Sequence, residues 1–527
     1  MPFSERMSPV DTTWLRMDRP ANPMVITGIL VLDPPVDLDR LQATLLDRLL
    51  AIPRFRMRIE ARGIEHAWCE VMDLDTDWHM RRTRLPGQGG RAELERFVGH
   101  LASEQLDKRR PPWQFHIVEH YDGDKAVVVA RLHHAIADGI ALIGVMLSLT
   151  DEMPGQPRRL FSRGHNNGHS DSAWLFSALP EAVRGGLRTS GSLVKEALAI
   201  ASNPLGSLKT GVGVASELAY LLLMPSDTPT RFKGAPGGIK KVAWTDPIPL
   251  PEVKAVSRVL GCSVNDMLLA SVAGAMHGYL AAKGDRTDGV EIRALVPVNL
   301  RSETEQGELG NAFGIIAVEL PVGIANPLAR LAEVTKRMSA LKSSLEPPVT
   351  LGLLTALGFA PQVVQDQLFD LLLSRSSAVM TNVPGPQHPL SMAGANISQI
   401  MFWVPQSGNI GLGVSILSFN GHVQFGLMTD AALVPDPQAV IDRFGPEFEQ
   451  MLYFVLMAGA EHGEVSETME VGKSAPSRHV NGSRSKAASP KKKPRAGKRK
   501  PVKAAASTAA SAKGKRKNGK PLSKPRR

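Results

Sequence analysis

Two adjacent histidines, followed by an aspartate and a glycine, carry the clearest chemistry in this sequence. They are His133, His134, Asp138 and Gly139. Neighbouring side chains of a strand point to opposite sides, so only one histidine can face a given cavity. Asp138, one turn later, can hold the geometry of that histidine, and Gly139 leaves room beside it. The pattern therefore indicates a single positioned imidazole base.

Metal binding and chance are the two competing interpretations of this pattern. A zinc site needs ligands on a common face and usually a third nitrogen, sulfur or oxygen ligand at a recognisable spacing. Adjacent histidines do not share a face, so we predict neither a metal nor a bound cofactor. A lone histidine pair is commonly incidental, whereas this four-residue match should arise by chance in roughly a few of a thousand chains of this size.

A strand and a helix should position the histidines. Residues 126–132 are mostly apolar and β-branched, and the turn-forming Asp122-Gly123-Asp124 precedes them. An amphipathic helix is predicted after Gly139 from apolar residues at helical spacing, namely Ile140, Ile143, Gly144 and Leu147. The base would then stand at the end of a strand.

Strand and helix patterns also alternate through the rest of the chain, which indicates a mixed α/β protein. The predicted strands are 24–32, 113–120, 291–298, 313–322, 378–383, 411–419 and 422–428. The predicted helices are 38–50, 91–105, 251–260, 263–282, two that begin near Pro327 and Leu351, and a last one after Pro437. Asn420-Gly421 predicts a type I′ hairpin turn.

The charge of the chain is divided between an acidic body and a basic tail. Of the 62 Lys and Arg residues, 20 lie from Val471 onward, where Asp and Glu do not occur, so the other 42 are set against 51 acidic residues. From about Ser466 the composition predicts disorder. Residues 151–170 resemble a loop, and 174–223 should form either a crossover between domains or a segment at a membrane interface.

Cysteine content and hydropathy favour a cytoplasmic protein that is soluble or peripheral to membranes. The two cysteines, Cys69 and Cys262, lie far apart and fit a reducing compartment. No signal-like apolar segment is visible at the N-terminus, and no run reaches the roughly 18 apolar residues of a spanning helix.

The histidine motif resembles the His-His-x-x-x-Asp-Gly signature of CoA-dependent acyltransferases, which condensation domains of peptide synthetases share. Further motifs occur in the order found in the bacterial wax ester synthase/diacylglycerol acyltransferase family, and the resemblance covers about Met7 to Ala458. These motifs are Ser8-Pro9-Val10-Asp11-Thr12-Thr13-Trp14-Leu15, Pro53-Arg54-Phe55-Arg56, Pro112-Trp113, Asn265-Asp266, Leu309-Gly310-Asn311 and Asn382-Val383-Pro384-Gly385-Pro386. Pro111-Pro112-Trp113 departs from the usual Pro-Leu-Trp, which affects only a packing contact.

The resemblance implies a two-lobed α/β fold similar to chloramphenicol acetyltransferase. The lobes would be residues 1–170 and 232–465, joined by a helical crossover at 171–231 and followed by a disordered basic tail at 466–527. Acyl-CoA would be the co-substrate, and diacylglycerol or a long-chain alcohol would be the acceptor.

The resemblance also implies a role for each residue of the motif. His134 would be the general base of a direct transfer without an acyl-enzyme, and no Gly-x-Ser-x-Gly elbow occurs to suggest otherwise. Asp138 would orient the site, His133 would be structural, and Gly139 would keep a substrate tunnel open. A neutral imidazole suits this task because its reference pKa is near 6.5.

Several assignments stay open. Asn265 and Asp266 could support the site, but Ser263 and Asp266 also have the spacing of a helix capping box. The oxyanion needs a donor, for which Asn265 and Ser415 are candidates. For Arg54 and Arg56 we favour solvated charges over contacts to a CoA phosphate.

Two other functions are alternatives to acyl transfer to an alcohol. A condensation domain that forms amides would need carrier-protein domains, and this chain shows none. A non-catalytic lipid-droplet protein could use the basic tail to bind nucleic acid or an anionic membrane. The tail could equally be a solubilising segment. For the protein as a whole, we expect a location peripheral to membranes or lipid droplets.

Overall fold

A computed structural model describes residues 3–63, 65–151, 223–300, 310–311, 313–341 and 346–470. Most of the predicted loop and crossover, at 152–222, and most of the basic tail, at 471–527, lie outside the described residues. Contacts divide the chain into two units, Met1–Val465 and Ser466–Arg527.

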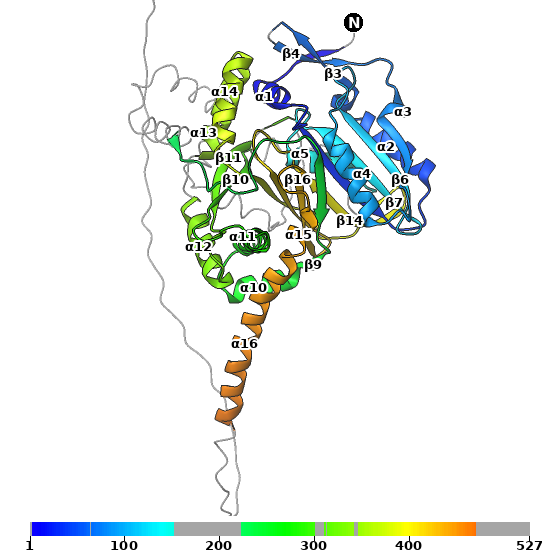
Figure 1. Ribbon diagram of the computed structural model, residues 1–527. Helices are drawn as coiled ribbons and strands as arrows, with labels where there is room; N and C mark the ends of the chain where they lie inside the picture. The colour runs from blue at the N-terminus through cyan, green and yellow to red at the C-terminus, as the bar shows by residue number, and fades with distance from the viewer. Residues whose placement is uncertain are drawn as a thin grey trace, which may run out of the picture. The chain divides into compact units, whose positions relative to one another are not determined.

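The first lobe is built on a six-stranded sheet with the order β13-β14-β2-β7-β6-β5 (Figure 1). Its strands are β2 (Val25–Leu32), β5 (Met80–Arg84), β6 (Trp113–Tyr121), β7 (Lys125–His133), β13 (Leu390–Met392) and β14 (Ala395–Trp403). Helices α2 (Leu38–Leu50) and α5 (Gly139–Ser148) cover one face, and α4 (Arg91–Ser103) covers the other. Because both faces are covered, β7 is apolar on both sides, as its sequence predicts.

Short elements complete this lobe. A three-stranded sheet has the order β1-β4-β3. These elements are β1 (Ser4–Arg6), α1 (Pro9–Met17), the 3₁₀ turn η1 (Pro53–Arg56), β3 (Met57–Arg62), β4 (Glu65–Glu70) and α3 (Thr76–His79).

The second lobe contains a seven-stranded sheet with the order β11-β10-β12-β15-β16-β8, with β9 also paired to β16. Its strands are β8 (Lys240–Trp244), β9 (Ile248–Pro249), β10 (Ile292–Asn299), β11 (Phe313–Leu320), β12 (Ala378–Pro384), β15 (Leu412–Phe419) and β16 (His422–Asp430). Its helices are α10 (Leu250–Val259), α11 (Val264–Ala282), α12 (Pro327–Leu341), α13 (Glu346–Phe359), α14 (Gln362–Leu373), α15 (Pro437–Ile441) and α16 (Phe444–Glu470). The buried side chains of α11 and the sheet form the largest core.

The second half of the chain contributes two strands to the first lobe. β14 pairs with β2 from Ile397 and Leu32 to Trp403 and Thr27. Directly after β14, Val404 N donates to Ser415 Oγ of β15 at 3.3 Å. The sequence patterns did not reveal this crossing, because strand periodicity does not identify the partner strand.

Three local predictions need correction. Helix α5 buries Ala141, Leu142 and Val145, whereas Ile143 and Leu147 of the predicted apolar face are only partly buried. Since this helix is apolar all round, its sequence does not indicate which face is buried.

The predicted helix from Leu351 is wrong in its bounds, because α13 begins at Glu346, with prolines in its first turn, and α14 follows as a separate helix. The single helix predicted after Pro437 is in fact α15 and α16, and α16 continues beyond Ser466 to Glu470.

The hairpin prediction is confirmed. Asn420 and Gly421 between β15 and β16 both have positive φ, 46° and 76°, as a type I′ turn requires.

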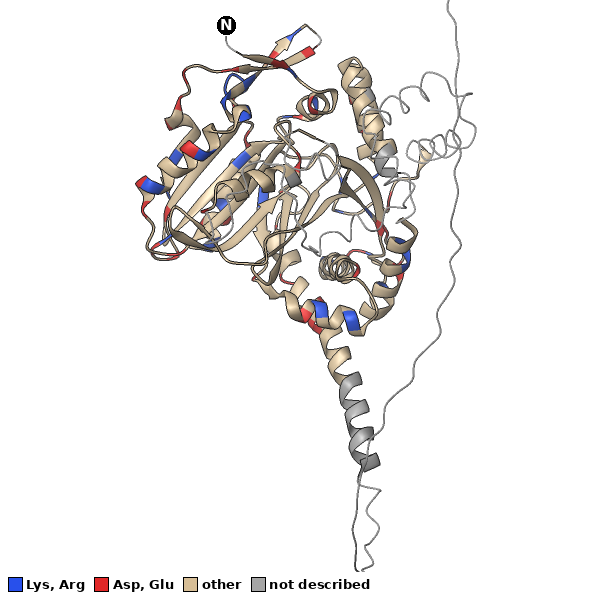
Figure 2. Ribbon diagram, turned by 180° about the vertical axis from the view of Figure 1, so that it is seen from behind, with Lys and Arg blue, Asp and Glu red and all other residues tan. Residues whose placement is uncertain are grey.

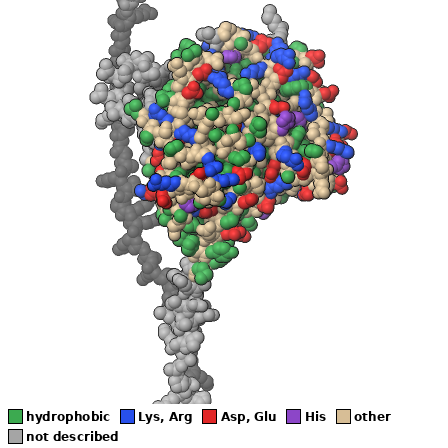
Figure 3. Space-filling view, viewed as in Figure 1, with side chains coloured by type: hydrophobic (Ala, Val, Ile, Leu, Met, Phe, Trp, Pro, Cys, Tyr) green, Lys and Arg blue, Asp and Glu red, His purple; other side chains and the backbone are tan. Residues whose placement is uncertain are grey.

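Acidic and basic residues are mixed over the described helices and strands (Figures 2 and 3). In the described part of the chain, no single helix is long and apolar enough to cross a membrane. Helices α10 and α11 together have the length and composition of a membrane-spanning segment, but the chain bends by 98° between them.

Candidate functional site

The two motif histidines stand where three segments of the first lobe meet. His133 is the last residue of β7, and its N–H donates to Pro112 O, just before β6, at 3.0 Å. The N–H of His134 donates to Met24 O, just before β2, at 2.8 Å. These bonds fix the backbone of both residues at the end of the central strand.

His133 has a structural environment. Its side chain is buried, and its Nδ1 accepts a hydrogen bond from Ala135 N at 3.0 Å, which closes the turn after β7. Its Nε2 lies 4.0 Å from Asp18 Oδ2. Burial lowers the pKa of His133 to about 4 despite the Asp18 charge, so the ring is neutral near neutral pH.

His134 has different partners and is partly exposed. Trp14 of α1 stacks on its ring, with centroids 4.4 Å apart and an interplanar angle of 19°, and Phe313 of β11 lies at 5.8 Å. Its Nδ1 lies 3.1 Å from Asn311 Oδ1. Burial lowers the pKa of His134, while the Asp138 charge, its own carbonyl and Asn311 act in the opposite direction. The imidazole is therefore neutral and able to take a proton.

Asp138 forms the start of α5. Its carboxylate accepts from Ala141 N at 3.0 Å as an N-cap, and its own N–H donates to Gly310 O at 3.1 Å. These bonds set the direction in which the chain leaves the motif turn. A Cβ atom placed on Gly139 would meet no described atom within 4 Å, so there is free space beside the turn.

Asn311 links His134 to helix α1, although the sequence patterns gave Asn311 no chemical role. Ala137 and Gly310 form an isolated bridge, and Gly310 adopts a φ of +113°, which favours glycine. The next residue, Asn311, donates from N and Nδ2 to Asp11 Oδ1, at 3.1 and 2.8 Å. Its Nδ2 also donates to His134 O at 3.0 Å. Asp11, Trp14 and Asn311 lie in motifs that resemble those of the family. Their place in these motifs was the only sign in the sequence that they belong to the site.

Asp11 is a buried carboxylate. Burial raises the pKa of Asp11 above its ordinary value, although the bonds from Asn311 and Ser8 and the charge of Arg54 act in the opposite direction. Arg54 packs over the ring of Trp68 at 4.4 Å and is 13% exposed, so its interpretation as a solvated charge is wrong. A guanidinium is weakly hydrated and stacks well on an aromatic ring, which explains its burial.

Arg56 differs from Arg54. It forms an ion pair with Glu70 at 3.3 Å and is 37% exposed. It therefore has a protein partner at the surface of the first lobe.

Asn265 and Asp266 begin α11. Ser263 N donates to Asp266 Oδ2 and Asp266 N donates to Ser263 Oγ, both at 3.1 Å, which is the predicted capping box. Asn265 Oδ1 accepts from Asn382 Nδ2 at 3.1 Å, so two of the motifs meet there. The structure brings neither Asn265 nor Asp266 into hydrogen-bond contact with His134.

The second oxyanion candidate, Ser415, is fully buried in β15. Its Oγ accepts from Val404 N, and its position therefore ties β14 to β15. The role of oxyanion donor remains a prediction for both candidates.

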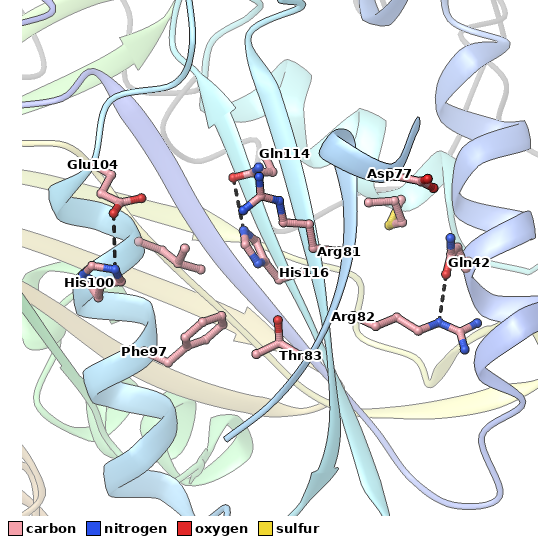
Figure 4. Close-up of a pocket in the computed structure, with 12 residues that line it drawn as sticks. Gln42, Asp77, Arg81, Arg82, Thr83, Phe97, His100, Glu104, Gln114 and His116 are labelled. Atoms are coloured by element: carbon pink, nitrogen blue, oxygen red, sulfur yellow. Dashed lines mark hydrogen bonds and ion pairs between the residues drawn. The ribbon is translucent and has the colours of Figure 1, made fainter. Parts of the chain in front are cut away.

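A pocket of about 740 Å³ lies apart from the motif, beside β5 and α4 (Figure 4). Among its lining residues, His116 Nε2 lies 3.2 Å from Gln114 Oε1, and this oxygen accepts a hydrogen bond from Arg131 at 2.8 Å. Burial and the charges of Arg131 and Arg81 lower the pKa of His116 to about 3. Neither motif histidine lines this pocket. Within the described ranges, no group of three His, Cys, Asp or Glu side chains could hold a metal ion.

Two family models match the chain. Residues 7–268 match the wax ester synthase/diacylglycerol acyltransferase catalytic domain, and residues 309–452 match the WS/DGAT C-terminal domain. Among curated proteins, the chain is 27% identical over 421 residues to the probable diacylglycerol O-acyltransferase tgs1 of Mycobacterium tuberculosis, covering 78% of this chain and 88% of that one. It is 26% identical to the probable enzyme tgs2 of the same organism, covering 82% and 96%.

Solved structures share the fold. The wax ester synthase/diacylglycerol acyltransferase from Marinobacter aquaeolei VT8 matches with a TM-score of 0.60 and 21% identity, over 85% of this chain and 99% of that one. The first condensation domain of the calcium-dependent antibiotic synthetase matches with a TM-score of 0.53 and 13% identity, over 85% and 97%. These similarities confirm the predicted two-lobed α/β fold.

Proposed function

The chain belongs to the wax ester synthase/diacylglycerol acyltransferase family, and we propose that it transfers a long-chain acyl group from acyl-CoA to diacylglycerol, a long-chain alcohol, or both. His134 is the general base of this O-acyltransferase. The observation that carries the proposal is a partly exposed, neutral imidazole whose Nδ1 is held by Asn311.

The reaction needs no covalent enzyme intermediate. His134 takes the proton of the acceptor hydroxyl as its oxygen attacks the thioester carbonyl, which forms a tetrahedral oxyanion. The oxyanion collapses, the carbon–sulfur bond breaks, and the imidazolium returns the proton to the CoA thiolate. The products are an ester and free CoA, and such proton transfer contributes roughly 10²- to 10⁴-fold to the rate.

The surroundings of His134 suit hydrophobic substrates. Trp14 and Phe313 contact its ring and belong to an apolar cluster that also contains Leu354 and Leu357 of α13. An apolar site also favours the neutral form of the imidazole. Acyl-CoA enters as a co-substrate, and the acceptor and CoA contacts are assigned to no residue.

The test is a lipid-class assay. The purified full-length protein is incubated with radiolabelled palmitoyl-CoA and either hexadecanol or dioleoylglycerol, and the products are separated by thin-layer chromatography. Label should appear in wax ester, triacylglycerol or both, and His134→Ala should abolish it while circular dichroism shows a folded protein. Label in free fatty acid alone, or equal activity of parent and variant, would overturn the proposal.

A second measurement addresses the direct mechanism. The protein is mixed with palmitoyl-CoA without acceptor, quenched in acid and weighed by intact-protein mass spectrometry. An unmodified mass is expected. A stoichiometric palmitoyl adduct that disappears on addition of hexadecanol would replace direct transfer with an acyl-enzyme.

The non-catalytic alternative predicts no turnover in either assay. Against it, Asn311 holds His134 at two points, since its Oδ1 faces Nδ1 of the imidazole and its Nδ2 donates to the His134 carbonyl oxygen. This geometry favours the enzymatic function.

A further inference from the structure

The side-chain amide of Asn311 has a fixed orientation. Its Nδ2 lies 2.8 Å from Asp11 Oδ1 and 3.0 Å from the carbonyl oxygen of His134. Asp11 Oδ1 also accepts from the backbone N of Asn311, and the carbonyl oxygen of His134 can only accept, so both hydrogens of the NH₂ group are used. A flipped amide would place its oxygen against two other oxygens, and this orientation is therefore excluded by the hydrogen-bond network.

The orientation of Asn311 determines the tautomer of His134. With Nδ2 directed at the two acceptors, Oδ1 faces Nδ1 of His134 at 3.1 Å. A carbonyl oxygen can only accept, so Nδ1 must carry the hydrogen. In a neutral imidazole the lone pair then resides on Nε2, which makes no hydrogen bond to the described residues.

We infer that Asp11 and Asn311 are positioning residues that hold His134 in the Nδ1–H tautomer and thereby make Nε2 the basic atom. The second half of this inference rests on the proposed function, since it assigns the proton acceptor of acyl transfer to one atom. The first half concerns the free protein alone. Neither residue contacts the reacting atoms, and each acts through its neighbour.

Asp11 is suited to orient the amide. Its Oδ1 accepts from both the backbone N and Nδ2 of Asn311, which fixes the side chain relative to its own backbone. Asp11 N in turn donates to Ser8 Oγ at 3.0 Å, which anchors the start of α1. Since this single oxygen accepts both bonds, its removal would release the amide of Asn311.

Histidine NMR tests the tautomer without any substrate. The full-length protein is labelled with ¹⁵N in its imidazole rings, and the His134 signals are identified by their loss in His134→Ala. The expected spectrum at neutral pH shows a protonated Nδ1 and an unprotonated Nε2. A protonated Nε2 in the parent protein would overturn the inference, whatever the outcome of the activity assays.

Variants test the two positioning residues. Asn311→Leu and Asp11→Ala should each shift the His134 signals toward a mixture of tautomers and lower kcat about 10- to 100-fold, with little change in the KM for palmitoyl-CoA. Asp11→Asn keeps an oxygen that can accept both bonds from Asn311, so it should retain the Nδ1–H tautomer.

Gln406→Leu is the matched control for loss of a buried amide. Gln406 donates to Gly411 O and Met428 O, both at 2.8 Å, and these partners belong to the second lobe. This variant should lose stability but keep the parent tautomer and pH profile. Unchanged tautomer signals in folded Asn311→Leu and Asp11→Ala would overturn the inference. If Asn311→Leu does not fold, the parent spectrum and Asp11→Ala still decide it.

Discussion

At the scale of single residues, burial gives neighbouring histidines different chemistry. His133 is buried and closes a turn, whereas His134 is partly exposed and rests on Trp14. The sequence allowed this division to be predicted, since adjacent residues of a strand face opposite sides. The sequence could not reveal the contact between His134 and Asn311, because Asn311 lies 177 positions further along the chain and only folding brings the two together.

The acid limb of the pH–rate profile should report His134. A general base works only when unprotonated, and burial lowers the pKa of His134 below 6.5. The value of kcat/KM should therefore fall toward low pH with a midpoint below 6.5. Asp138→Asn should move this midpoint further down, because the Asp138 charge favours the protonated ring. The rate of CoA release measured across pH checks both, and a midpoint above 6.5 would contradict this assignment.

His133→Ala should destabilise the fold. The variant leaves the N–H of Ala135 without its acceptor in a buried turn, which costs about 1–3 kcal/mol of unfolding free energy. His133→Asn should recover part of this loss, because a short amide can accept from the N–H two residues on. Urea unfolding followed by circular dichroism measures both. Equal stability of parent and His133→Ala would refute the structural role.

The same variants should change the dependence of stability on pH. The pKa of His133 is about 4 in the folded protein against 6.5 as its reference, so between these values the unfolded chain binds the extra proton. Stability is therefore lost as pH falls from 6.5 toward 4, by at most about 1.4 kcal/mol per pH unit for one proton. His133→Asn lacks this group and should lose less stability than the parent over that window.

At the scale of elements, local signals predicted well and long-range pairing did not. The cap of α11, the hairpin at Asn420-Gly421 and the apolar strand β7 follow from neighbouring residues, and the structure contains all three. The pairing of β14 with β2 depends on residues more than 360 positions apart, as the 367 positions between Ser398 and Val31 illustrate. Which face of α5 is buried depends on the side chains that pack against it. The sequence of an all-apolar helix does not indicate that face.

The capping box of α11 offers a test of structure against catalysis. Ser263→Ala removes the acceptor of Asp266 N, and Asp266→Ala removes the acceptor of Ser263 N, so each should cost about 1 kcal/mol of unfolding free energy. Because the two bonds are reciprocal, the double variant should cost less than the sum. Ser263→Thr, which keeps the hydroxyl, is the control.

Activity separates the two interpretations of Asp266. If Asp266 only caps the helix, both alanine variants should keep the kcat of the parent at a temperature where they are folded. A loss of kcat in Asp266→Ala that Ser263→Ala does not share would instead give Asp266 a part in the site.

At the scale of the whole molecule, the chain combines an acidic body with a basic tail. The two-lobed fold could be predicted because several motifs in a fixed order identify a family, and the family implies the fold. The partner of the tail could not be predicted in the same way, since a run of Lys and Arg is attracted to any polyanion.

Truncation after Glu470 tests the tail. It removes 20 basic and no acidic residues, so binding to DNA or to anionic vesicles should weaken, and the salt dependence of that binding should become shallower. Acyl transfer in detergent should be preserved, since the motif residues all precede the truncation.

A full-length variant with every Lys and Arg after Glu470 replaced by Gln is the matched control, because it keeps the length of the tail and removes its charge. Filter binding and vesicle sedimentation near physiological ionic strength compare the three proteins, since low salt lets the acidic body compete for the tail. The truncated and neutral-tail proteins should bind equally weakly. Retention of DNA and vesicles by both as strongly as by the parent would place polyanion binding in the body, and loss of turnover on truncation would make the tail part of the catalytic fold.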